Sequence, residues 1–167
     1  MTESAYDLIE TPIGVVAIVC GRDAMLSLYF LDRKPEVTDG AARVIDPMGY
    51  SSRIRSYFDG DLEALNAIQV DPGGTPFQRI VWDALRTIPP GRTESYGGLA
   101  AKIRRPNACR AVGLANGQNP ISLVIPCHRV IGSDGKLTGY GGGLNRKKWL
   151  LEHEGALPRA LAALSSP

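Results

Sequence analysis

The pattern of apolar and polar positions along the chain begins with short β-type runs. Three runs are rich in β-branched and aromatic residues and are separated by the turn-forming segments "TPIG" and "GRDA". These runs predict three strands: Ala5–Glu10, Val15–Cys20 and Met25–Leu31.

A helix is predicted next, in "PMGYSSRIRSYFDG". Pro47 suits an early helical position, and Gly60 suits the position just after a helix end. One more strand is predicted over Asn66–Val70.

The apolar spacing then changes from strand-like to helical. Thr75, Pro76 and Gln78 form a capping-box pattern that predicts a helix start. The apolar residues that follow recur at helical spacing: Phe77, Ile80, Val81, Ala84, Leu85 and Ile88. "PPG" ends this helix.

Two short helices follow in the most basic stretch of the chain. Ser95 can cap one helix through about Ile103, and Asn107 can cap another through about Asn116. Their close spacing predicts a helix-turn-helix. A last helix is predicted over Asn145–Glu154, with a loosely held tail after it.

These elements predict two domains. "DPGG", at Asp71–Gly74, is a natural boundary. The chain is expected to have an α/β (α+β) fold, with an α/β domain over residues 1–74 and a mostly helical domain over residues 75–167.

Charge is distributed unequally between these parts. The 167 residues carry a net charge of +2. Residues 1–74 hold 6 Lys and Arg against 12 Asp and Glu, whereas residues 75–155 hold 12 against 5. The basic part could bind a polyanion such as a nucleic acid, and a merely solvated basic face is the alternative.

The composition excludes several other classes. No stretch has the roughly 18 apolar residues of a membrane span, and the acidic N-terminus does not resemble a signal peptide, so a cytoplasmic protein is expected. Three cysteines (Cys20, Cys109 and Cys127) and two histidines predict neither a disulfide framework nor a metal site.

The candidate chemistry lies in "NPISLVIPCHRVIGSDG". Cys127 is followed directly by His128, a base that could take the thiol proton through a bridging water. Glu152 or Glu154 could orient the imidazole, and the sequence pattern does not choose between them. A buried, inert cysteine is the alternative.

The motif "PCHRV" resembles the active-site signature of the O6-alkylguanine-DNA alkyltransferases. "SYGGLA", "RAVG", "NP", "GYGGG" and "LLEHEG" occur in that family's order and spacing over about residues 75–155. The resemblance implies a ribonuclease-H-like N-terminal domain and a winged-helix-like C-terminal domain that carries the helix-turn-helix and an active-site loop.

The resemblance also implies an activity, that of a methylated-DNA–protein-cysteine S-methyltransferase that acts once. An alkyl group would move irreversibly from O6-alkylguanine, and from O4-alkylthymine, to Cys127 without a cofactor. The partner would be double-stranded DNA, bound by a monomer that could cluster cooperatively. A lesion-binding protein without transfer is the main alternative, and a cysteine hydrolase is another.

The family's catalytic residues match five positions here. Cys127 would be the acceptor, His128 the base and Glu154 the acid of the relay. Asn119 would brace the turn before the active-site loop, and Tyr96 would donate to N3 of the base.

Further positions match residues that bind the lesion and DNA. Val130, through its carbonyl, Gly141, through its N–H, and Tyr140 would contact the flipped base. Arg110 would enter the base stack, and the remaining DNA contacts would come from Ser95, Ala108, Cys109, Ala111, Gly113, Arg104 and Arg105.

Two positions depart from the family pattern. Arg104 stands where glycine is common and would be strained if that backbone requires a positive φ. Cys109 replaces an alanine beside Arg110, where it could pack or expose an oxidisable thiol.

Overall fold

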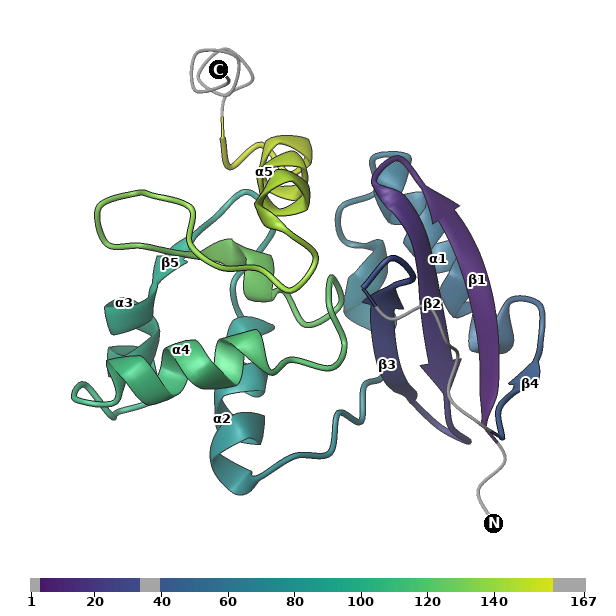
Figure 1. The fold of residues 1–167 in the computed structure, drawn as a ribbon, viewed down its shortest axis with the longest axis horizontal. Helices are drawn as coiled ribbons and strands as arrows, with labels where there is room; N and C mark the ends of the chain where they lie inside the picture. Colours follow the sequence, from purple (N-terminus) through teal and green to yellow (C-terminus); the bar gives the residue numbers. More distant parts are fainter. Residues whose placement is uncertain (1–3, 34–39, 158–167) are drawn as a thin grey trace. The chain divides into compact units, whose positions relative to one another are not determined.

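A computed structural model of the chain describes residues 4–33 and 40–157 (Figure 1). It contains two compact units. The first unit comprises Met1–Gly73 and Pro120–Val124, and the second comprises Gly74–Asn119 and Ile125–Pro167. Residues 120–124 were predicted to belong to the second domain, so the observed units differ from the predicted domains there.

The first unit is built on a four-stranded sheet with the order β3-β2-β1-β4. The strands are β1 (Ala5–Thr11), β2 (Gly14–Cys20), β3 (Met25–Phe30) and β4 (Ala42–Arg43). β1, β2 and β3 are antiparallel neighbours, as expected for strands joined by tight turns, and β4 lies parallel to β1. The three predicted strands are confirmed, whereas β4 was not predicted.

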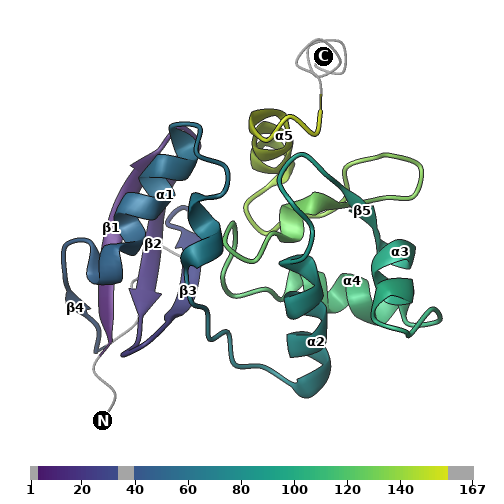
Figure 2. The same ribbon diagram turned by 180° about the vertical axis from the view of Figure 1, so that it is seen from behind.

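The helix α1 (Tyr50–Phe58) covers one face of this sheet (Figure 2). Ile54 and Tyr57 are completely buried on it. The predicted start at Pro47 is confirmed only in part: Pro47 opens a separate 3-10 turn, Pro47–Gly49, and positive φ angles of 59° at Met48 and 75° at Gly49 separate this turn from α1.

The predicted strand Asn66–Val70 is also wrong. Ala64–Ala67 forms a 3-10 turn, and Val70 makes an isolated bridge to Met25.

A segment from late in the chain completes the first unit at the other edge of the sheet. Leu28 N donates to Pro120 O at 3.0 Å, and Ser122 N donates to Leu28 O at 3.2 Å. Ile121 is fully buried there. The apolar run that precedes the cysteine therefore pairs with β3 at Ile121 and then turns, with a positive φ of 73° at Leu123.

The second unit contains α2 (Pro76–Leu85), α3 (Tyr96–Lys102), α4 (Cys109–Gly117) and α5 (Leu144–His153). The predicted capping box is confirmed, since Thr75 and Gln78 exchange hydrogen bonds of 2.9 and 3.1 Å. α2 ends three residues before Ile88. Trp82 Nε1 donates to Ala115 O at 2.8 Å and ties α2 to α4.

The helices α3 and α4 occupy the predicted helix-turn-helix positions. Ser95 Oγ accepts from Gly98 N at 2.9 Å, which confirms its predicted cap. The predicted cap at Asn107 is wrong: α4 follows Ala108, which makes no side-chain cap bond. α5 begins and ends one residue before its predicted bounds, and the predicted tail over residues 156–167 lies outside the described residues from residue 158 on.

A small parallel sheet, which the sequence pattern did not predict, joins two functional segments. β5 (Glu94–Ser95) pairs with β6 (Val130–Ile131). The residues just after the cysteine are thereby held next to the residues that start α3. No helix within residues 4–33 and 40–157 is long and apolar enough to span a membrane.

Candidate active site

Cys127 opens a short 3-10 turn, Cys127–Arg129, after Pro126. The residue is 6% exposed. Burial raises the pKa of the Cys127 thiol, although a hydrogen bond involving Asn119 and the charge of Lys147 act in the opposite direction. The thiol therefore rests protonated and becomes a nucleophile only when another group takes its proton.

A buried ion-pair cluster adjoins the cysteine. His128 Nε2 lies 2.9 Å from Glu154 Oε2. Arg129 donates to both carboxylate oxygens of Glu154, at 2.9 and 2.8 Å, and to Ile88 O at 2.6 Å. Of the two glutamates that the sequence pattern left open, Glu154 is therefore the one that contacts the imidazole.

The cluster fixes the protonation of its members. Burial alone would raise the pKa of Glu154, but His128 and Arg129 outweigh it and hold that pKa well below its usual value. An ionised carboxylate only accepts hydrogen bonds, so His128 Nε2 must carry the shared hydrogen.

The histidine is consequently poised as a base. Burial lowers the pKa of His128, with Glu154 acting in the opposite direction, so the ring is neutral near pH 7. With the hydrogen on Nε2, Nδ1 keeps its lone pair, and it has no hydrogen-bond partner among the described residues. Nδ1 can therefore accept a proton.

Lys147 is a site residue that was not predicted from the sequence. It is completely buried, and its Nζ donates to Val130 O and Thr138 O, both at 2.6 Å. Burial lowers the pKa of Lys147 to about 8, with Cys127 opposing the shift. The sequence did contain a signal for this role. Lys147 lies three residues before Leu150 and seven before Glu154, and this helical spacing places the lysine on the buried face of α5.

Arg129 was also missed as a partner of Glu154, although it lies within the quoted motif. The sequence alone does not indicate that Arg129 is buried, because a guanidinium is usually exposed unless it is paired, and its partner Glu154 is distant in the sequence.

Two asparagines brace the backbone around the cysteine. Asn119 Nδ2 donates to Ile125 O at 2.7 Å, across the loop that leads into the 3-10 turn. Asn116 Nδ2 lies 3.4 Å from Cys127 O and was not predicted. Both bonds hold the main chain of the cysteine segment in place.

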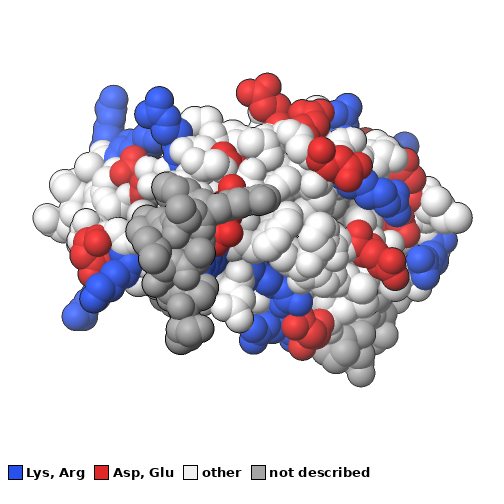
Figure 3. Space-filling model, turned by 90° about the horizontal axis from the view of Figure 1, so that it is seen from above, with Lys and Arg blue, Asp and Glu red and all other residues white. Residues whose placement is uncertain are grey.

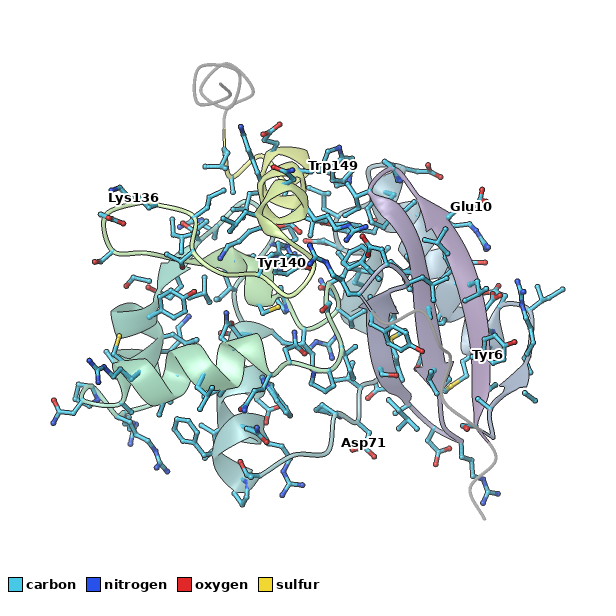
Figure 4. All side chains as sticks on the ribbon, in the orientation of Figure 1. Tyr6, Glu10, Asp71, Lys136, Tyr140 and Trp149 are labelled. Atoms are coloured by element: carbon cyan, nitrogen blue, oxygen red, sulfur yellow. The ribbon has the colours of Figure 1, made fainter. Side chains whose placement is uncertain are left out.

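The predicted base-contacting residues gather around the same loop. Tyr96 begins α3, and its hydroxyl lies 2.8 Å from Thr138 Oγ1. The ring of Tyr140 stands edge-on to that of His128, with 6.4 Å between the ring centroids. Figure 4 labels Tyr140 on the loop that leads into α5; Gly141 follows it and is exposed.

The predicted DNA-binding residues lie mainly on the helix-turn-helix. Cys109, Arg110 and Ala111 are exposed on α4, whereas Ala108 and Gly113 are half-buried. A Cβ atom at Gly113 would lie 3.7 Å from the Tyr96 ring, an ordinary van der Waals distance, so this position of α4 lies beside that tyrosine. Leu114, also exposed on α4, was not predicted.

The turn between α3 and α4 holds the two departing arginines. Arg104 has a φ of 62°, so the positive φ anticipated from the family pattern is present. The Arg105 guanidinium lies 5.6 Å from the Phe77 ring centroid, in cation–π geometry. Both side chains are exposed.

On the face shown in Figure 3, the described basic and acidic side chains are interspersed. Across the described part of the chain, no three His, Cys, Asp or Glu side chains gather as metal ligands would.

Comparisons of sequence identify close relatives. A family model described as "6-O-methylguanine DNA methyltransferase, DNA binding domain" matches residues 76–156. A methylated-DNA–protein-cysteine methyltransferase of Salmonella typhimurium is 48% identical over 161 residues, covering 89% of this chain and 94% of the relative. A protein of the same name from Methanosarcina barkeri is 44% identical over 152 residues, covering 89% of this chain and 96% of the relative.

Solved structures show the same fold over nearly the whole chain. Mycobacterium tuberculosis OGT in complex with DNA superposes with a TM-score of 0.81 at 41% identity, covering 96% of this chain and 99% of that one. The O6-methylguanine methyltransferase of the same organism gives a TM-score of 0.78 at 39% identity, covering 99% and 100%. The α/β fold class is thereby confirmed.

Proposed function

Because this chain belongs to the methylated-DNA–protein-cysteine methyltransferase family, we propose that it repairs alkylated DNA by taking the alkyl group onto Cys127. The substrate would be O6-alkylguanine in duplex DNA, with O4-alkylthymine as a second target. The observation that carries this proposal is a buried thiol next to a neutral histidine whose Nε2 is engaged by an ionised glutamate.

The first step is removal of the thiol proton. Nδ1 of His128 takes it through one bridging water, and the charged imidazolium that forms is stabilised by Glu154. Arg129 keeps Glu154 ionised and in place. Because burial raises the thiol pKa, the thiol stays protonated until this base takes the proton.

The second step is displacement at carbon. The Cys127 sulfur forms a bond to the alkyl carbon as the bond from that carbon to guanine O6 breaks, and the electron pair stays on guanine. Tyr96 supplies a proton-donating hydroxyl to N3, and the N–H of Gly141 faces O6, where negative charge develops. The carbonyls of Cys127 and Val130 accept from the exocyclic amine and select guanine over adenine.

The target base must leave the duplex before it can reach a buried thiol. We assign the exposed Arg110 on α4 to the space that the flipped nucleotide vacates, with Ala111 and Gly113 permitting close approach in the minor groove. Arg104 and Arg105 add phosphate contacts from the turn. These contacts keep the flipped base in position for transfer.

The product is a thioether, and the relay has no group that would hydrolyse a C–S bond. The protein therefore acts once, and the proposed chemistry calls for no cofactor. One thiol and one lesion suffice, so we propose that a monomer acts on DNA in the cytoplasm, and that several copies can cluster on one duplex.

A stoichiometric assay tests this proposal. Limiting protein is mixed with a duplex that carries one O6-methylguanine, and restored guanine is counted against protein. We expect one guanine per protein and then no further reaction. Continued turnover would indicate a hydrolase, and tight binding without restoration would indicate the lesion-binding alternative.

A further inference from the structure

Thr138 contacts Tyr96 across a long stretch of sequence. Its Oγ1 lies 2.8 Å from the Tyr96 hydroxyl, although 42 residues separate the two positions. Tyr96 begins α3, whereas Thr138 lies in the loop between β6 and α5. The mechanism above gives Tyr96 a donor role but assigns nothing to the hydroxyl that faces it.

The backbone of Thr138 is held from inside the unit. Buried Lys147 donates to Thr138 O and, with the same amino group, to Val130 O. Val130 belongs to β6, and β6 pairs with β5, which directly precedes Tyr96. The Lys147 amino group therefore links the Thr138 backbone to the strand pair that holds Tyr96. The threonine is therefore fixed relative to Tyr96.

The side chain of Thr138 is also oriented. Its Cγ2 methyl lies over Gly132, 3.7 Å from where a Cβ atom at that glycine would stand. A β-branched side chain has few accessible χ1 rotamers, and the rotamer that turns the methyl of this exposed residue toward Gly132 also directs its hydroxyl at Tyr96.

We propose that Thr138 is a positioning residue for Tyr96: its hydroxyl donates to the phenolic oxygen and leaves the phenolic hydrogen for the departing guanine. A phenol that accepts one hydrogen bond becomes a stronger donor in the next, because hydrogen bonds in a chain polarise one another. The strengthened donor acts when negative charge forms on the base. This inference rests on the proposed function.

The experiment compares Thr138→Val, which keeps the shape but removes the hydroxyl, with Thr138→Ser, which keeps the hydroxyl. Single-turnover transfer is measured at saturating O6-methylguanine duplex, and duplex affinity is measured separately. Loss of one neutral hydrogen bond predicts a rate about three- to tenfold lower for Thr138→Val, with unchanged affinity. Thr138→Ser should restore the wild-type rate.

A double-mutant cycle separates this role from general packing. In a Tyr96→Phe background, Thr138→Val should lower the rate by less than about twofold, because the group it acts through is gone. Thr87→Val is the matched control, since the exposed Thr87 hydroxyl donates to Ala84 O at the end of α2, and it should leave the rate unchanged.

Three results would overturn the inference: an unchanged rate in Thr138→Val, an equally slow Thr138→Ser, or effects that multiply independently in the cycle. If wild-type protein transferred no alkyl group, the proposed function itself would fail as well. Transfer by wild type with no dependence on the Thr138 hydroxyl would remove the positioning role alone.

Discussion

Each unit of the molecule contains a buried carboxylate, and the two carboxylates have different partners. Asp7 in the first unit accepts from Ser51 Oγ at 2.7 Å and from the N–H groups of Leu8 and Asp46 at 2.9 and 3.0 Å. Glu154 in the second unit is paired with His128 and Arg129.

Both groups have a lowered pKa, but for different reasons. Burial would raise the pKa of Asp7, and hydrogen bonds from Ser51 and the backbone outweigh it. For Glu154, burial is outweighed by the hydrogen bonds and charge that its two partners, His128 and Arg129, direct at the carboxylate. A shifted pKa therefore does not identify an active site; the informative feature is a titratable partner beside a nucleophile.

The largest expected difference comes from removing one partner of each carboxylate. His128→Gln should lower the transfer rate about 10²–10⁴-fold, because the general base is lost while Arg129 still neutralises Glu154. Ser51→Ala should leave transfer unchanged and lower the free energy of unfolding by about 1–2 kcal/mol. Single-turnover kinetics and urea unfolding measure the two effects.

Similar behaviour of the two variants would contradict the distinction between the two carboxylates. Transfer at the wild-type rate in folded His128→Gln would remove the histidine from the relay. A slow Ser51→Ala protein of normal stability would mean that the Asp7 cluster contributes to the chemistry.

A second pair of variants compares exposed helical arginines. Arg110→Ala on α4 should slow repair of duplex substrate about 10–100-fold, because unstacking a base costs a few kcal/mol that the inserted side chain offsets. Arg53→Ala on α1 should have no effect. Reaction with free O6-benzylguanine should be normal in both, and an equal loss on both substrates for Arg110→Ala would refute the flipping role.

The pH dependence of stability should also distinguish the units. In the unfolded chain His128 binds a proton near its ordinary pKa of 6.5, whereas the folded pKa is lower. The unfolded state then holds more protons below pH 6.5, so the free energy of unfolding falls as the pH falls. Asp7, whose folded pKa is also lowered, contributes with the same sign only below about the ordinary aspartate pKa of 3.8.

Urea unfolding at pH values on either side of 6.5 tests this assignment. Wild-type protein should lose stability with acidification in that range, and His128→Gln should show a flatter dependence. An equally steep dependence in the variant would mean that other groups cause the loss.

The smallest expected effect concerns backbone strain. Met48 in the first unit and Arg104 in the second have φ angles of 59° and 62°. Met48→Gly and Arg104→Gly should each stabilise the protein by up to about 1 kcal/mol. Only Arg104→Gly should weaken binding to undamaged duplex, and loss of stability on either change would show that the side chain contributes more than the strain costs.

Local patterns in the sequence were sufficient for some of this structure. The strands Ala5–Thr11 and Gly14–Cys20, and the caps at Thr75 and Ser95, depend on neighbouring residues and were predicted. The start of α1 was not, since nothing in Met48 signals a left-handed backbone.

Pairing between distant segments could not be predicted from local sequence patterns. The return of Pro120–Val124 to the first unit and the β5–β6 pair require contacts that no local pattern encodes. The family motif pointed to Cys127, His128 and Glu154, but the buried roles of Lys147 and Arg129 appear only when α5 packs against the cysteine turn.

The most direct test of the central claim is mass analysis of the Cys127 peptide after reaction with O6-methylguanine duplex. We expect one methyl group in place of the thiol hydrogen on Cys127, in proportion to the guanine restored, with Cys20 and Cys109 unmodified. Restored guanine with an unmodified Cys127, or a methyl group on another residue, would contradict the account.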